Sequence, residues 1–201
     1  MKQKMNYTIL GGMVIGLGAM FFITTGKSYA FTLGILAIVS LELPLITGYL
    51  PWATYNKTLK TSTISNTLLG NIIGAGMAGT WICSIPKGKM MCDRIQEIVA
   101  TKNSMSAMEL INSGMITGLL IAIGVIAYNK QKGNFLGIVM LLMSVTAFVA
   151  LGTDHIVANA FYVVADGTVH YHDSLRLLFY SGLGNAIGGI FTGLGIYAGG
   201  K

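Results

Sequence analysis

Charged side chains are scarce in this sequence. Its 7 acidic and 13 basic residues make up 10% of the 201 positions, whereas ordinary soluble domains carry about 25%. A domain with a charged, water-exposed surface is therefore excluded. Cysteine is scarce as well, because Cys83 and Cys92 are the only two, and two cysteines are too few for a disulfide framework.

Clusters of basic residues are also missing, although the net charge is +6. The lysines and arginines are spread over short segments between apolar runs, without the basic stripe and interleaved aromatic residues that nucleic-acid binding uses. Apolar side chains are abundant instead, at 53% of the residues and a mean hydropathy of +0.68. Long apolar runs between short charged segments are typical of a polytopic membrane protein.

Six apolar segments reach the roughly 20 residues that cross a bilayer core. We predict an all-α membrane protein with spanning segments at 7–25, 30–54, 65–85, 107–128, 135–163 and 174–198. An even number of spans places both termini on the same side of the membrane. With that side cytoplasmic, seven basic residues face inward and six outward, so the positive-inside rule alone does not orient the chain.

The two halves of the sequence resemble one another. The segment LLGNIIGAG at 68–76 returns as GLGNAIGGI at 182–190, and GGMVIGL at 11–17 returns as SGMITGL at 113–119. Chance similarity among glycine-rich apolar segments is the alternative explanation. Many of the 27 glycines have the small-xxx-small spacing of closely packed helices, and we expect them to lie at helix contacts.

Three spans in each half force the halves into opposite orientations, as in the inverted repeats of transport proteins. We therefore predict a single transmembrane domain over 1–201, with one repeat at about 7–85 and the other at about 107–198. The middle span of each repeat is interrupted, by SLELPLITGYLPW at 40–52 and by LGTDHIVAN at 151–159. Broken backbone at membrane depth is tolerated only inside protein or beside a cavity, so the two breaks indicate a transport site.

Two adjacent ionisable residues, Asp154 and His155, lie in the second break, and Glu42 lies just before the first. An intramembrane aspartate or glutamate costs at least about 2.5 kcal/mol on insertion scales, which makes such residues functional candidates. The structural alternative is that Asp154 caps the helix that follows and that His155 is a satisfied interior histidine. The adjacent carboxylate and the matching break favour a function.

The segment GTDHIVANAF at 152–161 resembles the fifth-span signature of the formate/nitrite transporter family. LGNIIG and LGNAIG are similar to that family's third- and sixth-span motifs, GMVIGLGAMFFITTG at 12–26 to its first span, and AFTLGILAIVSLELPLITG at 30–48 to its second. The resemblance covers most of residues 10–198. It implies an aquaporin-like protomer of six spans in two inverted repeats, assembled as a homopentamer in the plasma membrane, with cytoplasmic termini and one pore per protomer.

The resemblance also implies roles for individual residues. His155 matches the central pore histidine, and Asp154 matches the acidic residue before it. Thr47 matches a loop threonine that faces this histidine, and Leu45 and Ile46 stand beside it in the same constriction. The remaining matches are two bulky residues that form hydrophobic constrictions on either side of the histidine, a vestibule lysine that attracts anions, and the signature asparagine: Phe31, Phe148, Lys102 and Asn159.

Two positions depart from the family pattern. Pro44 stands where the family usually has an acidic residue, so that Glu42 is the nearest acid. Gly118 stands where many members have a pore asparagine, and Asn112 replaces that asparagine only if the alignment slips. These departures bear on selectivity and gating rather than on the fold.

The function implied is a channel or transporter, not an enzyme, for small monovalent anions of weak acids such as formate, nitrite or hydrosulfide. We expect the anion to pass as the neutral acid after protonation at His155, since histidine titrates near neutral pH. The expected partners are this anion, membrane lipid and further copies of the chain, with no cofactor, metal or nucleic acid.

Two alternatives stay open. Within the same fold, the substrate is a short-chain monocarboxylate such as lactate or acetate. A membrane metal protein is the other, because His170 and His172 lie close to Asp166 and Asp173, although a solvated loop explains these residues better. A water or glycerol channel is disfavoured, because the breaks lack the paired Asn-Pro-Ala motifs of those pores.

Overall fold

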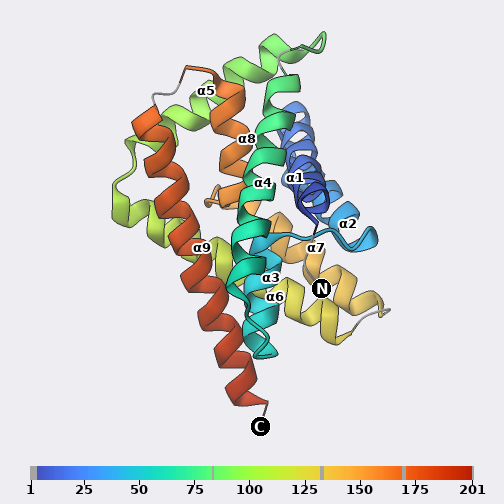
Figure 1. The fold of residues 1–201 in the computed structure, drawn as a ribbon. Coiled ribbons are helices and arrows are strands. Elements are labelled where there is room, and N and C mark those ends of the chain that lie inside the picture. The colour runs from blue at the N-terminus through green and yellow to red at the C-terminus, as the bar shows by residue number, and fades with distance from the viewer. Residues whose placement is uncertain (1–3, 83, 132–133, 169–170, 201) are drawn as a thin grey trace.

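The computed structural model describes residues 4–82, 84–131, 134–168 and 171–200, whose regular structure is entirely helical (Figure 1). Cys83 and His170 lie outside the described residues. The predicted all-α fold class is confirmed. The elements in chain order are α1 (Met5–Thr25), η1 (Ser28–Phe31), α2 (Thr32–Ser40), α3 (Ile46–Tyr55), α4 (Thr61–Ile82), α5 (Gly88–Ser104), α6 (Ala107–Lys130), α7 (Phe135–Ala150), α8 (Ile156–Asp166) and α9 (Tyr171–Gly199).

Each predicted span contains helix, and the second and fifth spans are broken as predicted. The second is divided into α2 and α3, and the fifth into α7 and α8. Within the described part of the chain, three helices (α1, α6 and α9) are both long and apolar enough to cross a bilayer. α4 has a similar length, but its first turns read TSTISNT, which lowers its hydropathy.

One helix, α5, was not predicted. Its buried residues Met91, Ile95 and Val99 recur every four positions on one face, whereas the rest of the helix is mostly polar. A search for long apolar runs passes over such an amphipathic helix. Figure 1 shows α5 lying across the upper end of the molecule, near α8, so it covers one end of the bundle.

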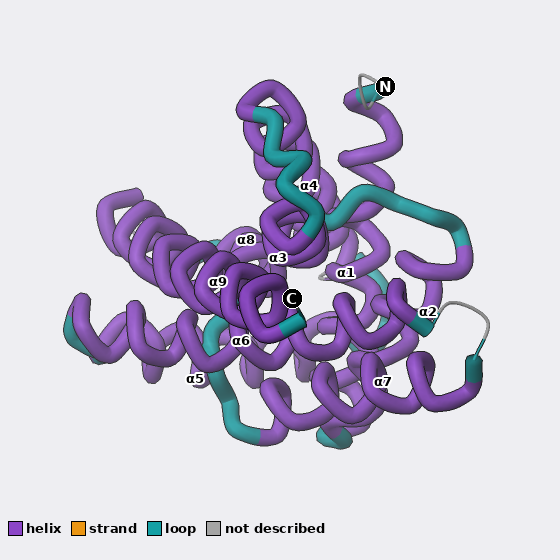
Figure 2. Tube along the Cα trace, turned by 90° about the horizontal axis from the view of Figure 1, so that it is seen from below, coloured by secondary structure: helices purple, strands orange, loops and turns teal. Residues whose placement is uncertain are grey.

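Close packing joins α1 to α4 and α6 to α9, and Figure 2 shows α6 and α9 side by side. A Cβ added at Gly74 would meet the carbonyl oxygen of Ile9, and one added at Gly188 would meet that of Met115. Lipid tails are as apolar as leucine, so helices in a membrane associate through close backbone approach rather than hydrophobic expulsion. These glycines therefore lie at helix contacts, as the small-xxx-small spacing predicts.

One asparagine holds each break. Asn71 Oδ1 accepts a hydrogen bond from the N–H of Ile46 at 2.8 Å, and Asn185 Oδ1 accepts one from the N–H of Ile156 at 2.9 Å. Each Nδ2 donates to the carbonyl two residues before that N–H, at 2.9 and 2.7 Å. The first N–H of each half-helix and a loop carbonyl are thereby satisfied, which backbone away from water requires. The two LGN motifs thus perform the same task.

The helices before the breaks end in the same turn. The N–H of Leu43 donates to the carbonyl five residues earlier at 2.9 Å, and that of Thr153 does so at 3.1 Å. The residue before each of these has a left-handed conformation, Glu42 with φ 53° and Gly152 with φ 69°. Glycine adopts this conformation freely, whereas a residue with a side chain is disfavoured by roughly 1–2 kcal/mol. The first repeat therefore uses a less favourable residue at this turn.

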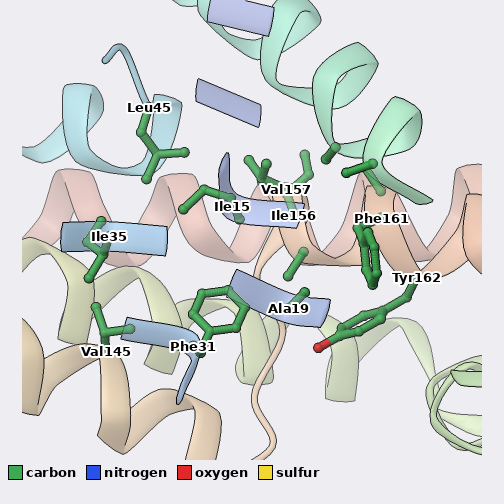
Figure 3. Packing of buried hydrophobic residues seen from close by; sticks show 14 of the residues in the cluster. Ile15, Ala19, Phe31, Ile35, Leu45, Val145, Ile156, Val157, Phe161 and Tyr162 are labelled. Carbon is green, nitrogen blue, oxygen red and sulfur yellow. The ribbon is translucent and has the colours of Figure 1, made fainter. Parts of the chain in front are cut away.

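The half-helices α3 and α8 lie at the centre of the molecule, with α8 in the upper part and α3 in the lower part of Figure 1. Buried apolar side chains from several elements surround their first turns. Figure 3 shows this core, which includes Ile15, Phe31, Ile35, Leu45 and Val145. The two breaks therefore meet inside protein, as irregular backbone at membrane depth requires.

Candidate functional site

Three cavities follow one another through the centre of the molecule. The first, the Lys102 vestibule, has a volume of about 260 Å³ and is lined mainly by α5, α7 and α8. The second, the central chamber, has about 10 Å³. The third, the Glu42 vestibule, has about 340 Å³ and is lined by α2, α3, α6 and the first break. Two wide spaces thus flank a very small one.

Shared wall residues join the three cavities in a line. Phe31, Phe148 and His155 line both the Lys102 vestibule and the chamber. Ile35 and Leu45 line both the chamber and the Glu42 vestibule. A cavity needs at least about 10–15 Å³ to hold a single water molecule. The chamber is therefore a narrow neck between two wider mouths.

His155 is the one polar side chain among the residues that line the chamber. It is 2% exposed and caps α8, because its Nδ1 accepts a hydrogen bond from the N–H of Ala158 at 3.3 Å. Its Nε2 lies 2.9 Å from Thr47 Oγ1. Since Nδ1 acts as an acceptor, the neutral ring carries its proton on Nε2 and donates it to the threonine hydroxyl. Thr47 thus faces His155 across the two breaks, as the resemblance implies.

Asp154 is fully buried, and three side chains donate hydrogen bonds to its carboxylate. Lys102 Nζ lies 2.5 Å from Oδ1, Ser113 Oγ 2.6 Å from Oδ2, and Asn159 Nδ2 3.0 Å from Oδ1. The structural alternative, in which Asp154 caps α8, is wrong. His155 supplies the cap itself, and both of its ring nitrogens have other partners. Asp154 instead neutralises Lys102.

Lys102 lies in the last turn of α5, on the wall of the Lys102 vestibule. Its vestibule position agrees with the resemblance, but its ammonium is paired with Asp154 and only 8% of the residue is exposed. An anion in this vestibule therefore meets the dipole of an ion pair rather than an isolated positive charge.

Ser113 was not predicted as a site residue. It donates to the Asp154 carboxylate and accepts a hydrogen bond from the N–H of Asp154 at 2.9 Å. The sequence repeat could have indicated this residue. In the repeat, Ser113 corresponds to Gly11, and Gly11 lies directly against the carbonyl of Pro44 in the first break. The polar residue at the corresponding place in the second half points to a partner in the second break.

Phe31 and Phe148 contact each other edge to face, with ring centroids 5.7 Å apart and an interplanar angle of 78°. Together they close the chamber at the Lys102 vestibule, so the expectation that they lie on either side of the histidine is wrong. Phe31 stands at the start of the second span and Phe148 near the end of α7, which is the first half of the fifth span, and both lie where the Lys102 vestibule meets the chamber. Ile35 and Leu45 close the other end.

The remaining predicted residues divide between cavity and core. Leu45 is the N-cap residue of α3 and lines the chamber. Ile46, beside it, is 3% exposed in the hydrophobic core, where Asn71 binds its N–H. Asn159 is fully buried and lines the Lys102 vestibule. Leu45 and Asn159 are thus placed along the cavities, whereas Ile46 supports the first break.

Gly118, which stands where many family members have a pore asparagine, lies at the contact between α6 and α9. A Cβ added there would meet the carbonyl oxygen of Asn185 in α9, and the α6 residue on the wall of the chamber is Ile121. Asn112 is exposed and lines none of the three cavities, so it does not replace a pore asparagine. Pro44 lies at the position of the first break that corresponds to Asp154, and its carbonyl accepts a hydrogen bond from Asn71.

The metal-protein alternative gains no support from the described residues. In the described ranges, no group of three or more histidine, cysteine, aspartate or glutamate side chains could hold a metal ion. His172 and Asp173 form an exposed pair at 3.4 Å, and Asp166 accepts hydrogen bonds from Thr168. His155 uses both ring nitrogens within the protein.

Comparisons with known proteins agree with this geometry. The model of a family described as "Formate/nitrite transporter" matches residues 2–199. Among solved structures, an "FNT family ion channel" is similar with a TM-score of 0.81 and 18% identity, covering 96% of this chain and 88% of that one. A "Pentameric formate channel with formate bound" is similar with a TM-score of 0.79 and 17% identity, covering 96% and 95%. No curated protein matches the chain. At these identities, the solved structures show a shared fold.

Proposed function

Because the chain belongs to the formate/nitrite transporter family, we propose that it conducts small monovalent anions of weak acids across a membrane as their neutral acids. Formate, nitrite and hydrosulfide are the substrates of this class. One observation carries the proposal: His155, a buried imidazole bonded to Thr47, stands between two vestibules in a neck that is otherwise apolar.

Passage of the charged anion through the chamber is unfavourable. Removing an ion from water costs between several and about 20 kcal/mol, and His155 is the one polar side chain on the wall. Protonation requires less free energy, because a carboxylic acid with a pKa near 4 costs about 1.4 kcal/mol per pH unit, or about 4 kcal/mol at pH 7. The neutral acid then bears only the smaller penalty of burying a polar group. The neutral route is therefore favoured.

His155 is placed to exchange the proton. In the neutral ring, Nδ1 accepts from the N–H of Ala158 and Nε2 donates to Thr47. A second proton can bind at Nδ1 only when the hydrogen bond to Ala158 opens. The imidazolium then releases its Nε2 proton to the anion, which leaves a neutral acid and a neutral ring protonated on Nδ1. Uptake of a proton at Nε2 and loss of the one at Nδ1 restore the first tautomer.

The ends of the half-helices favour an anion at the mouths of the neck. The N-cap residues of α3 and α8, Leu45 and His155, both line the chamber, so both helix N-termini point toward it. The N-terminus of a helix carries a partial positive charge that attracts anions. The anion is thus concentrated at the mouths of the neck and loses its charge at His155, on the wall of the chamber.

The proposed assembly is a homopentamer in the plasma membrane, with two inverted repeats and its own pore in each protomer and with both termini cytoplasmic. The likeness to a pentameric formate channel, over 95% of that chain, supports the pentameric assembly. The outer surface carries large exposed apolar side chains such as Phe135, Tyr171 and Phe191. Such a surface is suited to lipid or to neighbouring protomers.

The size of the chamber favours the smallest acids. With about 10 Å³ of free volume, the neck must widen for any acid to pass. The displacement of Phe31, Phe148, Ile35 and Leu45 grows with the size of the acid. Formate, nitrite and hydrosulfide are smaller than acetate and lactate, so we propose them as substrates ahead of these two acids.

Stopped-flow measurements on proteoliposomes test the proposal. We expect formate and nitrite influx above that of empty liposomes, and loss of this influx in Phe148→Trp, because an indole does not fit beside Phe31 at a ring distance of 5.7 Å. Phe135→Trp is the matched control, since Phe135 is 78% exposed on the outer surface. Influx no faster than in empty liposomes contradicts the proposed function, and equal influx in the two variants contradicts the proposed path.

A further inference from the structure

Most polar groups on the wall of the Lys102 vestibule are already bonded within the protein. Lys102 binds the Asp154 carboxylate, and the hydroxyl of Thr101 donates to a carbonyl of α5. The hydroxyl of Thr153 donates to the carbonyl of the residue five positions earlier at 3.1 Å. Both ring nitrogens of His155 have partners as well. These groups have little remaining capacity for a ligand.

Two groups on α8 differ from them. Tyr162 is only 6% exposed and lines this vestibule, yet within the described residues its hydroxyl has no hydrogen-bond partner. Figure 3 shows this hydroxyl turned toward the side on which Phe31 lies. Asn159 lines the same vestibule, is fully buried, and has no partner for its Oδ1.

The orientation of the Asn159 amide is fixed by its neighbours. Its Nδ2 lies 3.0 Å from the Asp154 carboxylate and 3.1 Å from Ser181 Oγ. A carboxylate accepts hydrogen bonds and does not donate them, and the Ser181 hydroxyl donates its own proton to a carbonyl of α9. The nitrogen must therefore face these two groups, and the unpartnered atom is the carbonyl oxygen, an acceptor.

A hydrogen-bond donor and an acceptor thus stand on one wall of the vestibule. Asn159 and Tyr162 are three residues apart on α8, so they share a face with their Cβ atoms about 5–6 Å apart. Buried polar groups in proteins are nearly always hydrogen-bonded. Asn159 Oδ1 is a buried atom without a partner, and the Tyr162 hydroxyl has no partner among the described residues. Together they indicate a place, on the vestibule wall shared with Phe31 and Phe148, for a molecule that brings its own donor and acceptor.

We propose that Tyr162 and Asn159 bind the protonated form of a small oxyacid, an inference that rests on the function proposed above. The Tyr162 hydroxyl donates to the double-bonded oxygen of the acid, and Asn159 Oδ1 accepts from the acid's O–H. An anion lacks the proton for the second bond. Hydrogen sulfide offers only weak sulfur donors and acceptors. The pair therefore gives this mouth of the neck a preference for acids such as formic and nitrous acid over hydrogen sulfide.

Tyr162→Phe tests the inference, because it removes the hydroxyl and keeps the ring. Formate, nitrite and hydrosulfide fluxes are measured in the same proteoliposome preparations. We expect the formate and nitrite fluxes to fall about fivefold relative to the hydrosulfide flux, the effect of one lost hydrogen bond. Tyr162→Met, which fills the space with a flexible apolar side chain, has the same expected result. Tyr180→Phe is the matched control, since Tyr180 packs on Phe179 in α9.

The outcomes separate this inference from the proposed function. Wild-type fluxes equal to those of empty liposomes overturn both. Measurable wild-type fluxes with an unchanged ratio of formate to hydrosulfide in both Tyr162 variants overturn only the Tyr162 and Asn159 site. An equal fall of all three fluxes also overturns it, because a structural role of Tyr162 does not discriminate between acids.

Discussion

Asp154→Asn removes the charge of the buried ion pair and keeps the shape of the side chain. Lys102, 8% exposed, is then left without a neutralising partner, and the donors Ser113 and Asn159 at 2.6 and 3.0 Å lose their bonds to a carboxylate. Removing one partner of a buried pair costs about 3–5 kcal/mol. In a domain of this size, 1 kcal/mol lowers Tm by about 2–4 °C. The lower figure of about 3 kcal/mol therefore gives a fall of about 6–12 °C.

The assay is thermal unfolding of the purified protein in detergent. We expect Lys102→Met to be destabilising as well, because it leaves the carboxylate buried and unpaired, and the double variant to be more stable than either single variant. Glu97→Gln removes an exposed acidic charge from α5 and is the control, with an expected effect within about 0.5 kcal/mol. An Asp154→Asn protein with the Tm of the wild type refutes the assignment of this pair as a buried, mutually neutralising unit.

Three further substitutions probe the neck and the breaks. Thr47→Val removes the hydroxyl that His155 contacts, so we expect the formate flux to fall by about a factor of ten. Thr47→Ser keeps a hydroxyl at this position and should keep the flux. Equal flux in both variants contradicts the role of this hydrogen bond. Asn71→Leu leaves the N–H of Ile46 and a loop carbonyl unpaired, so we expect the free energy of unfolding to fall by roughly 2–6 kcal/mol. An unchanged Tm shows that the break does not depend on Asn71. Gly118→Asn forces a side chain against the backbone of α9, so we expect a lower Tm; a stable variant with altered selectivity shows that this position faces the pore.

The fold could be predicted where the chemistry is local. Long apolar runs indicate membrane spans, and Pro44 and Gly152 mark backbone that does not continue a helix. Asn71 and Asn185 lie in a repeated motif, and each closes a break in the same way. Helix α5 was not predicted because its apolar residues occupy only one face of an otherwise polar segment.

The site could be predicted only in part, because its partners are distant in sequence. Lys102 and Ser113 reach Asp154 across 52 and 41 residues, and no local pattern pairs them. The positions of Phe31 and Phe148 depend on how far along its span each residue lies, which a match of residue types does not resolve. The orientation of Gly118 depends on the rotation of α6 about its axis, which is fixed by packing against α9.

The central claim is that the acid crosses the neck with its proton. Proteoliposomes with a pH indicator inside and a membrane potential set by a potassium gradient test it directly, after subtraction of the flux in empty liposomes. We expect each formate that enters to acidify the lumen by one proton, at a rate that does not change with the imposed potential. Formate uptake that follows the imposed potential and leaves the luminal pH constant contradicts the claim, because the charged anion itself then crosses.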